Sequence, residues 1–224
     1  MQIVIIGAGG HGKVVLDILR AGGRYEPVGY LDADPALAGT TVGGLPVLGA
    51  VNLLPKLRQQ QKVRAAVVAI GDNRARAGYT QLLREQGFEL ITAVHPSAIV
   101  SPTARLGANV VVAAGAVICT EAVVGDSAIV NTAAIVDHEC QVGAATHVSP
   151  GVCLAGRVRV GPSAFIGIGA QVIPCLSVGE GATVGAGAVV LQDVPAFATA
   201  VGVPARVVKV SRPSPSLNAP ATES

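Results

Sequence analysis

The chain has 224 residues, of which 50% are hydrophobic, 13% charged and 3% aromatic. This composition is typical of a well-buried globular fold and excludes disorder over most of the chain. A formal net charge of +2, without a basic patch interleaved with aromatic residues, argues against nucleic acid as a partner. No charged leader precedes the first apolar run and no run is long enough to span a bilayer, so we expect a cytoplasmic protein without membrane insertion.

The first 95 residues alternate short apolar runs with segments of helical spacing. The run from Gln2 to Ile6 leads into a glycine-rich turn, residues 7–12, and then into a helical segment over residues 14–19. Further apolar runs occupy residues 28–31, 65–70 and 90–94. This alternation predicts a small parallel α/β sheet whose ligand edge lies where the strands end.

The glycine-rich turn reads Gly-Ala-Gly-Gly-His-Gly and matches G-x-G-x-x-G at every position. Asp32 lies beyond the last of these glycines, at the interval of about 20 residues where a Rossmann domain has the acid that binds ribose. Taken alone, the pattern would indicate NAD, but fewer than 100 residues are too few for both halves of a dinucleotide fold. Backbone N–H groups at a helix N-terminus bind the phosphate of any nucleotide. A tight turn without a ligand is the remaining alternative.

From Val100 to Val190 every sixth residue is aliphatic, at all sixteen positions and without an insertion. A period of six belongs to neither a helix nor an alternating strand and is typical of a parallel β-helix, in which stacked coils bury one continuous apolar column. Glycine often follows the aliphatic residue, and we expect it to permit the backbone bends at the corners.

Two further features of the sequence are its cysteines and its C-terminal segment. Four cysteines, Cys119, Cys140, Cys153 and Cys175, form no CxxC pair, which predicts thiols of a reducing compartment and neither disulfides nor zinc ligands. Asp137 to Cys140 are consecutive and cannot converge on one ion, so we expect no metal site. Residues 211–224 are rich in Ser, Pro and Ala and are expected to form a disordered tail.

These features together resemble the hexapeptide-repeat acyltransferases. More narrowly, the chain is similar to the bacterial sugar-nucleotide acetyltransferases and to the sialic acid O-acetyltransferases of the same architecture. Besides the hexads and the glycine turn, the resemblance rests on Gly-Asp-Asn-Arg at 71–74, His-Pro-Ser at 95–97 and Asp-His-Glu at 137–139. It implies a Rossmann-like α/β domain over residues 1–95 and a left-handed parallel β-helix over residues 96–210, with three hexads in each coil.

The resemblance also implies an activity. The implied enzyme is an N-acetyltransferase that transfers the acetyl group of acetyl-CoA to a nucleotide-linked 4-amino sugar. The resemblance further implies a homotrimer that uses acetyl-CoA as cosubstrate and has no bound cofactor. Three alternatives stay open: an O-acetyltransferase of sialic acid or another sugar, an NAD-dependent oxidoreductase, and a β-helix with a purely structural role.

The expected catalytic residues come from the Asp-His-Glu segment. By resemblance His138 is the general base, and Glu139 raises its basicity. Adjacency alone does not establish that the two touch, because neighbouring strand residues point to opposite faces. The residues expected to bind acetyl-CoA are His147, Gly156, Ile168 and Ala186. Gly156 follows His138 by one full coil of three hexads and is the candidate donor to the oxyanion.

The acceptor is assigned to the N-terminal domain. The residues expected to bind the sugar nucleotide are Gly9, Gly10, His11, Asp32, Ala33, Gly71 and Arg74.

His147 follows His138 by half a coil, so the two histidines should lie on different sides of one prism. They can serve a single site only across a subunit boundary, which agrees with the expected trimer.

Overall fold

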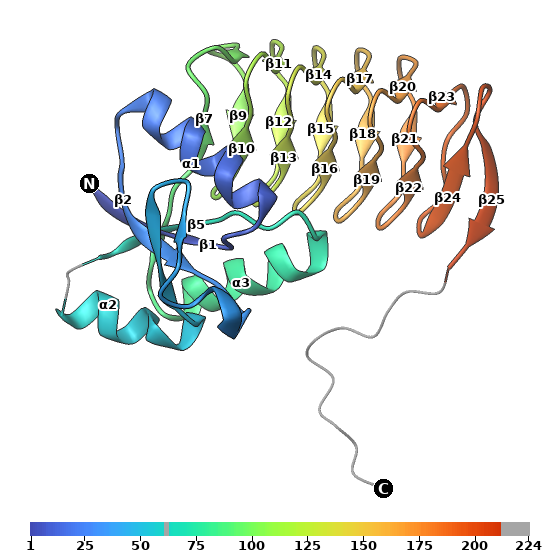
Figure 1. Ribbon diagram of the computed structural model, residues 1–224. Coiled ribbons are helices and arrows are strands. Elements are labelled where there is room, and N and C mark those ends of the chain that lie inside the picture. The colour runs from blue at the N-terminus through green and yellow to red at the C-terminus, as the bar shows by residue number, and fades with distance from the viewer. Residues whose placement is uncertain (61–62, 212–224) are drawn as a thin grey trace, which may run out of the picture.

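The computed structural model describes residues 1–60 and 63–211. The expected disordered tail therefore lies outside the described residues, except for Ser211. Figure 1 shows a small α/β unit at the N-terminus, packed against one end of a long prism of stacked coils.

The N-terminal unit is built on a six-stranded sheet of order β3-β4-β2-β1-β5-β6. Its strands are β1 (Gln2–Ile6), β2 (Glu26–Leu31), β3 (Thr41–Val42), β4 (Leu45–Gly49), β5 (Ala65–Val68) and β6 (Glu89–Leu90), all parallel except β3. The helices are α1 (Gly10–Gly22), α2 (Leu54–Gln60) and α3 (Asn73–Glu85), with short 3₁₀ turns at Pro35–Leu37 and Val51–Leu53. The predicted α/β sheet is confirmed. Among the described residues, no helix is long and apolar enough to cross a membrane.

Helix α1 begins at Gly10, inside the glycine-rich segment 7–12. Gly12 packs so closely against this turn that an added Cβ would lie 2.2 Å from the carbonyl oxygen of Gly7, so only glycine fits there. Gly7 itself has a φ of +102°, which side chains disfavour. The turn therefore directs the first N–H groups of α1 toward the carboxyl edge of the sheet.

The hexads form the prism that the repeat predicts, a left-handed parallel β-helix. Each contributes one two-residue strand, and strands one coil apart pair in parallel, as Ile135 does with Cys153. The coil strands are β7 (Ala93–Val94), β8 (Ile99–Val100), β9 (Arg105–Leu106), β10 (Val111–Val112), β11 (Val117–Ile118), β12 (Val123–Val124), β13 (Ile129–Val130), β14 (Ile135–Val136), β15 (Gln141–Val142), β16 (His147–Val148), β17 (Cys153–Leu154), β18 (Arg159–Val160), β19 (Phe165–Ile166), β20 (Gln171–Val172), β21 (Ser177–Val178), β22 (Thr183–Val184) and β23 (Val189–Val190). The apolar run at 90–94 thus divides between the two parts, because Ala93 and Val94 pair with β10.

Three sheets form the sides of the prism. They have the orders β25-β24-β22-β19-β16-β13-β10-β7, β23-β20-β17-β14-β11-β8 and β21-β18-β15-β12-β9. The second residue of each central strand is buried inside, as Ile118, Val136 and Leu154 are. An antiparallel ribbon, β24 (Ala198–Val201) and β25 (Arg206–Val210), closes the far end.

The glycines after the aliphatic positions have a different role from the one expected. The left-handed corner residues stand two places later and include Asn109, Ser127, Ala145 and Ser163, all with φ near +57°. The glycines themselves lie where successive coils approach closely: a Cβ at Gly161 would meet the backbone nitrogen of Glu180 at 2.5 Å. Close stacking of coils, not a left-handed φ, therefore requires glycine there.

We predict that Gly161→Ala lowers the free energy of unfolding by more than about 2 kcal/mol, because the backbone of the next coil cannot move aside. Gly151→Ala is the matched control, since Gly151 has a φ of +67° and open space around an added Cβ. It should cost about 1 kcal/mol of backbone strain. Thermal melting followed by circular dichroism compares the two variants, and equal midpoints would contradict the stacking argument.

Candidate functional site

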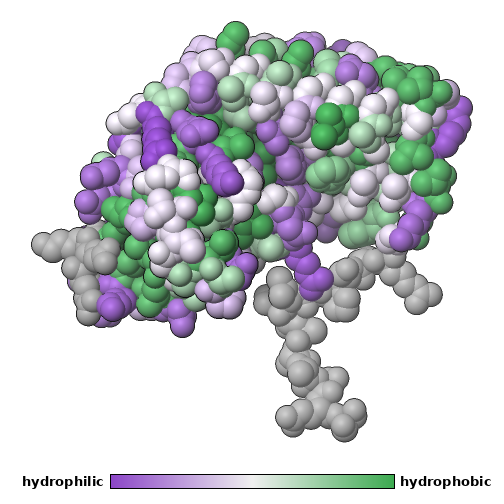
Figure 2. Space-filling view, viewed as in Figure 1, coloured by the Kyte–Doolittle hydropathy of each residue, from purple (hydrophilic) through white to green (hydrophobic). Residues whose placement is uncertain are grey.

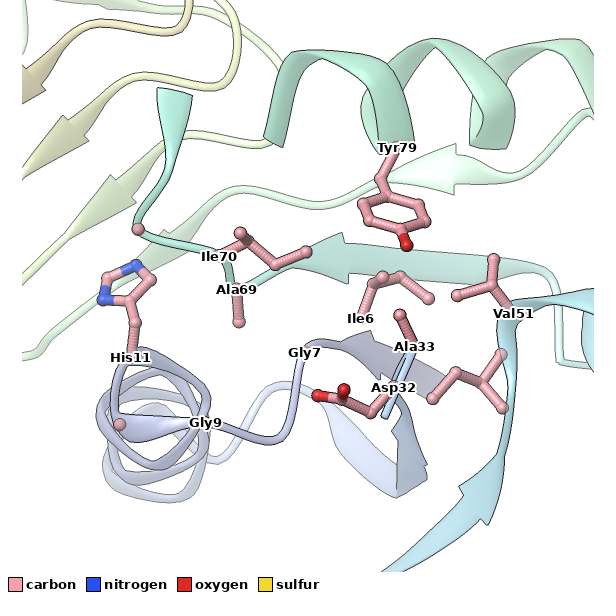
Figure 3. A pocket seen from close by; sticks show the side chains of 13 residues that line it. Ile6, Gly7, Gly9, His11, Asp32, Ala33, Val51, Ala69, Ile70 and Tyr79 are labelled. Carbon is pink, nitrogen blue, oxygen red and sulfur yellow. The ribbon is translucent and has the colours of Figure 1, made fainter. Parts of the chain in front are cut away.

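A cavity of about 280 Å³ opens at the carboxyl ends of β1, β2 and β5. Its lining residues are Ile6, Gly7, Gly9, Gly10, His11, Leu31, Asp32, Ala33, Val51, Ala69, Ile70, Gly71 and Tyr79. Figure 3 shows His11 on the α1 side of this cavity, with Tyr79 and Val51 on the opposite side. Six of the seven residues expected to bind a sugar nucleotide thus share one cavity. The seventh, Arg74, borders a neighbouring hollow on α3 that also includes Tyr79.

The carboxylate of Asp32, at the cavity, accepts two backbone hydrogen bonds. One carboxylate oxygen accepts from the N–H of Ala8 at 2.6 Å and the other from the N–H of Asp34 at 2.9 Å. The carboxylate thereby ties the glycine turn to the loop after β2. The structure supports a role for Asp32 in shaping the glycine turn, whereas its contact with a ligand stays a prediction.

Two histidines from distant parts of the chain meet beside the cavity. His11 stands in the first turn of α1 and His147 on β16, with their ring centroids 6.4 Å apart. His147 also packs edge-on against Phe165. Within the described part of the chain, His11 Nε2 is buried without a hydrogen-bond partner, and His147 Nδ1 is buried with only the backbone of Gly71 acting on it. Buried polar atoms of this kind are expected to pair with a ligand or ordered water.

Both imidazoles are neutral near pH 7. Burial lowers the pKa of His11 to about 4, and the charges of His147 and Arg76 lower it further in the same sense. Burial likewise lowers the pKa of His147 to about 4, with Arg76 again contributing. Asn131 fixes the tautomer of His147. Its Oδ1 accepts from the N–H of Thr132, so its Nδ2 donates to His147 Nε2 at 3.1 Å and the proton of the ring resides on Nδ1.

His138 stands at the corner between β14 and β15, on a different edge of the prism from His147. Its Nδ1 lies 3.0 Å from Glu139 Oε2, and the two side chains are 45% and 48% exposed. Contact between neighbours is possible because Glu139 is a corner residue with a φ of +57° and not part of a strand. A carboxylate at Nδ1 keeps the proton there and leaves the Nε2 lone pair free to accept another.

Gly156 lies directly over the imidazole of His138, one coil further along. A Cβ at Gly156 would come within 2.3 Å of His138 Nε2, so no larger residue fits without displacing the ring. The N–H of Arg157 donates to the carbonyl of His138 at 2.9 Å and fixes the register of the two coils. The backbone of Gly156 is therefore within reach of any group that reacts at Nε2.

Ile168 and Ala186 lie on yet another edge. They stand at successive corners after β19 and β22, and both are exposed, Ile168 by 62%. The residues expected to bind acetyl-CoA are therefore divided in one chain: Gly156 faces His138, Ile168 and Ala186 share a second edge, and His147 faces His11. Their common role stays a prediction.

Some site residues carried no signal in the sequence. Val51, Ile70 and Tyr79 line the cavity, but they lie outside any motif, and aliphatic and aromatic residues in such segments normally fill cores. Arg76, whose charge acts on both buried histidines, stands in a polar helix where an arginine is usually solvated. Among residues 1–60 and 63–211, no cluster of three or more His, Cys, Asp or Glu side chains could hold a metal ion.

The chain is similar to one protein family model and to several solved structures. The family model of the PglD N-terminal domain matches residues 2–83. PerB from Caulobacter crescentus, solved with CoA and GDP-perosamine, is 48% identical, with a TM-score of 0.89 over 93% of this chain and 98% of that one. The acetyltransferase domain of PglB from Neisseria gonorrhoeae FA1090, solved with acetyl coenzyme A, is 42% identical, with a TM-score of 0.87 over 92% of this chain and 98% of that one.

A curated relative agrees over a shorter stretch. The UDP-N-acetylbacillosamine N-acetyltransferase of Bacillus subtilis (strain 168) is 35% identical over 114 residues, which are 50% of this chain and 51% of the relative. The chain thus matches about half the length of that protein.

The lowered histidine pKa values predict acid sensitivity. The ordinary pKa of 6.5 applies to the unfolded chain and a pKa of about 4 to the folded one. Between these values the unfolded state binds more protons, so stability present above pH 6.5 is lost as the pH falls toward 4. His147→Gln should flatten this fall in thermal midpoint. His95→Gln, at a histidine that bonds Ser97 in its own turn, should leave the fall unchanged, and identical slopes in all three proteins would refute the assignment.

Proposed function

Because this chain belongs to the hexapeptide-repeat family of sugar-nucleotide N-acetyltransferases, we propose that it transfers the acetyl group of acetyl-CoA to the amino group of a nucleotide-linked 4-amino sugar. One observation carries the proposal. The chain combines a cavity at the N-terminus of α1 with a carboxylate-paired histidine under a glycine backbone.

The N-terminal unit anchors the nucleotide. The first N–H groups of α1 and the positive end of the helix dipole favour a diphosphate at Gly9 and Gly10. His11, neutral and with a buried free nitrogen, offers a hydrogen bond without adding charge. The residues on the far side of the cavity, Val51 and Tyr79, leave an apolar surface suited to the face of a base.

The prism supplies the acid–base chemistry. His138 Nε2 accepts a proton from the amino group as the nitrogen attacks the thioester carbonyl. The N–H of Gly156 faces the developing oxyanion, and among the described residues it donates to no backbone carbonyl. The C–S bond then breaks, and the proton held by His138 passes to the departing CoA thiolate. Glu139 stabilises the imidazolium in between.

A covalent acetyl-cysteine route has less support. Cys140, the cysteine two residues from His138, is buried, and burial raises the pKa of its thiol to about 11. A thiol with that pKa is protonated near neutral pH and is a poor nucleophile. Direct transfer from acetyl-CoA to the amine therefore fits the site better. All four cysteines are free, which also supports the cytoplasm as the working compartment.

We propose a homotrimer, because the residues assigned to one site lie on separate edges of each prism. The three faces of the prism differ in character. The α/β unit covers part of the eight-stranded face, burying Val111 and Ile129. The five-stranded face carries mainly polar outward residues, such as Arg105 and Arg159.

The six-stranded face is the apolar one. Five of its six outward residues are apolar: Ile99, Val117, Ile135, Cys153 and Val189. The end ribbon, which belongs to the eight-stranded sheet, also exposes valines, including Val207, Val208 and Val210, and Figure 2 shows hydrophobic surface at that end of the prism. A second copy of the chain is the partner that would cover such a face and bring two edges together.

A screen of acceptors tests the proposed activity. Nucleotide-linked 4-amino sugars with different bases are each mixed with acetyl-CoA, and release of free CoA thiol is followed. We expect turnover with at least one of them and none with free sialic acid; acetylation of the free sugar alone would overturn the proposal.

His138→Ala tests the proposed base and should lower kcat by about 10²–10⁴-fold with the fold intact. Near-normal turnover would remove His138 from the mechanism.

Complementation tests the shared site. His138→Ala and a cavity variant, Gly10→Asp, whose added carboxylate repels a diphosphate, should each be inactive alone. When they are co-expressed, roughly a quarter of the sites should combine an intact cavity with an intact histidine from a neighbouring chain. Activity should therefore reappear in the mixed protein, with a trimer mass by light scattering. A monomer, or mixed protein as inactive as its parents, would refute the intersubunit site.

A further inference from the structure

Arg76 of α3 is completely buried. Its guanidinium contacts six oxygen atoms drawn from both parts of the chain. The acceptors are the carbonyls of Ile70, Gly71, Ser127, Ala145 and Thr146 and the side-chain Oδ1 of Asn73, at 2.6 to 3.4 Å. The structure thus concentrates five backbone carbonyls around one cation.

A buried guanidinium needs compensation. Among the described residues, none of the acceptors that hydrogen-bond Arg76 is a carboxylate, and Asp72 acts on it only through its field. Burial lowers the pKa of Arg76 to about 10, so the group is charged at neutral pH. Its charge is stabilised by the five carbonyl dipoles, and charge-assisted bonds of this kind are stronger and more directional than neutral ones. Each carbonyl is accordingly held in place.

These carbonyls belong to the two sides of the proposed nucleotide site. Ile70 and Gly71 line the cavity. Ser127 and Ala145 are equivalent corner residues of successive coils, and Thr146 immediately precedes His147. The guanidinium therefore acts as a clasp that fastens the cavity wall to the coil that presents His147 to His11.

Neighbouring polar groups extend the same seam. Asn109 Oδ1 accepts from the N–H of Val68 on β5. Thr80 and Ser127 share a buried hydroxyl contact at 2.8 Å. Asn73 donates to the carbonyls of Ser163 and Ala164 one coil further on. Within this network Arg76 alone contacts the cavity wall and the His147 coil directly.

We propose that Arg76 is a positioning residue for the nucleotide-sugar site, which acts by fixing the Ile70–Gly71 wall of the cavity against the coil that carries His147. The inference rests on the proposed function. It also assigns His147 to the nucleotide-sugar side, because its ring faces His11 and not the other residues expected to bind acetyl-CoA. Losing the clasp then loosens the cavity and its histidine pair, whereas those other residues, Gly156, Ile168 and Ala186, lie on other edges of the prism and keep their geometry.

Three variants test the role. Arg76→Lys keeps the charge but loses the planar fork that reaches both sides, and Arg76→Met removes the charge as well. Arg84→Met is the control, because Arg84 bridges the same helix to the prism by an ion pair with Asp126 at the exposed surface. Kinetics are measured with the nucleotide sugar and acetyl-CoA varied in turn.

For Arg76→Lys we expect the KM for the nucleotide sugar to rise about tenfold or more, while the KM for acetyl-CoA stays within about twofold. Arg84→Met should change neither. A general loss of stability would lower the amount of active protein without separating the two KM values. Equal changes in both, or no change in folded Arg76→Lys, would overturn the inference.

A second readout does not depend on activity. The imidazole resonances of His11 and His147 are titrated by NMR in the wild type and in Arg76→Lys, which keeps the charge that lowers both pKa values, so that a shift reports the loosened packing. The pKa values of both should rise toward the ordinary value when the clasp is lost, and unchanged titration would refute it. A wild type that acetylates no nucleotide sugar would contradict the proposed function alone, because the titration still reports on the clasp. If Arg76→Met does not fold, the kinetics and the titration of Arg76→Lys decide the inference.

Discussion

The geometry of the cavity beside α1 depends on how the α/β unit is fixed against the prism, and buried polar groups determine this. Apolar contacts between α1 and the first coils bring the two parts together, but they tolerate sliding because they have no direction. Hydrogen bonds from Arg76, Asn109 and Thr80 are directional and become costly if one partner moves away. The seam therefore gives the interface a single register.

The prism contributes geometry of another kind. A coil of three hexads places equivalent residues of successive coils directly above one another. Side chains at such positions therefore stack, and a glycine at one of them leaves space for the side chain below. His138 occupies a corner where the residue above is glycine, and the space left by the missing side chain accommodates the imidazole. The left-handed φ of Glu139 then turns its carboxylate back onto the ring. The imidazole, the carboxylate and the glycine backbone are thus brought together by the stacking of successive coils.

Each chain holds two half-sites that face different directions. The cavity with His11 and His147 is on the side covered by the α/β unit, whereas His138 and Gly156 are on another edge. Rigid coils cannot bend to join them, because the interior is close-packed. A second copy across the apolar six-stranded face is the simplest way to bring an anchored amine to the base. In the trimer that we propose, oligomerisation completes the chemistry in addition to covering apolar surface.

The sequence by itself determined the features that depend on near neighbours. The hexads predicted stacked coils and the glycine turn predicted a strand, a tight turn and a helix, because each pattern is local or strictly periodic. Three hexads in each coil, and with them Gly156 over His138, were implied by the family resemblance. The sequence did not reveal that Glu139 contacts His138, since that requires the corner conformation. Only the tertiary structure decided the clasp and the histidine pair. Arg76 reaches carbonyls 51 to 70 residues away, and His11 meets His147 across the same seam. No periodicity records such contacts, because they arise when two independently patterned parts dock.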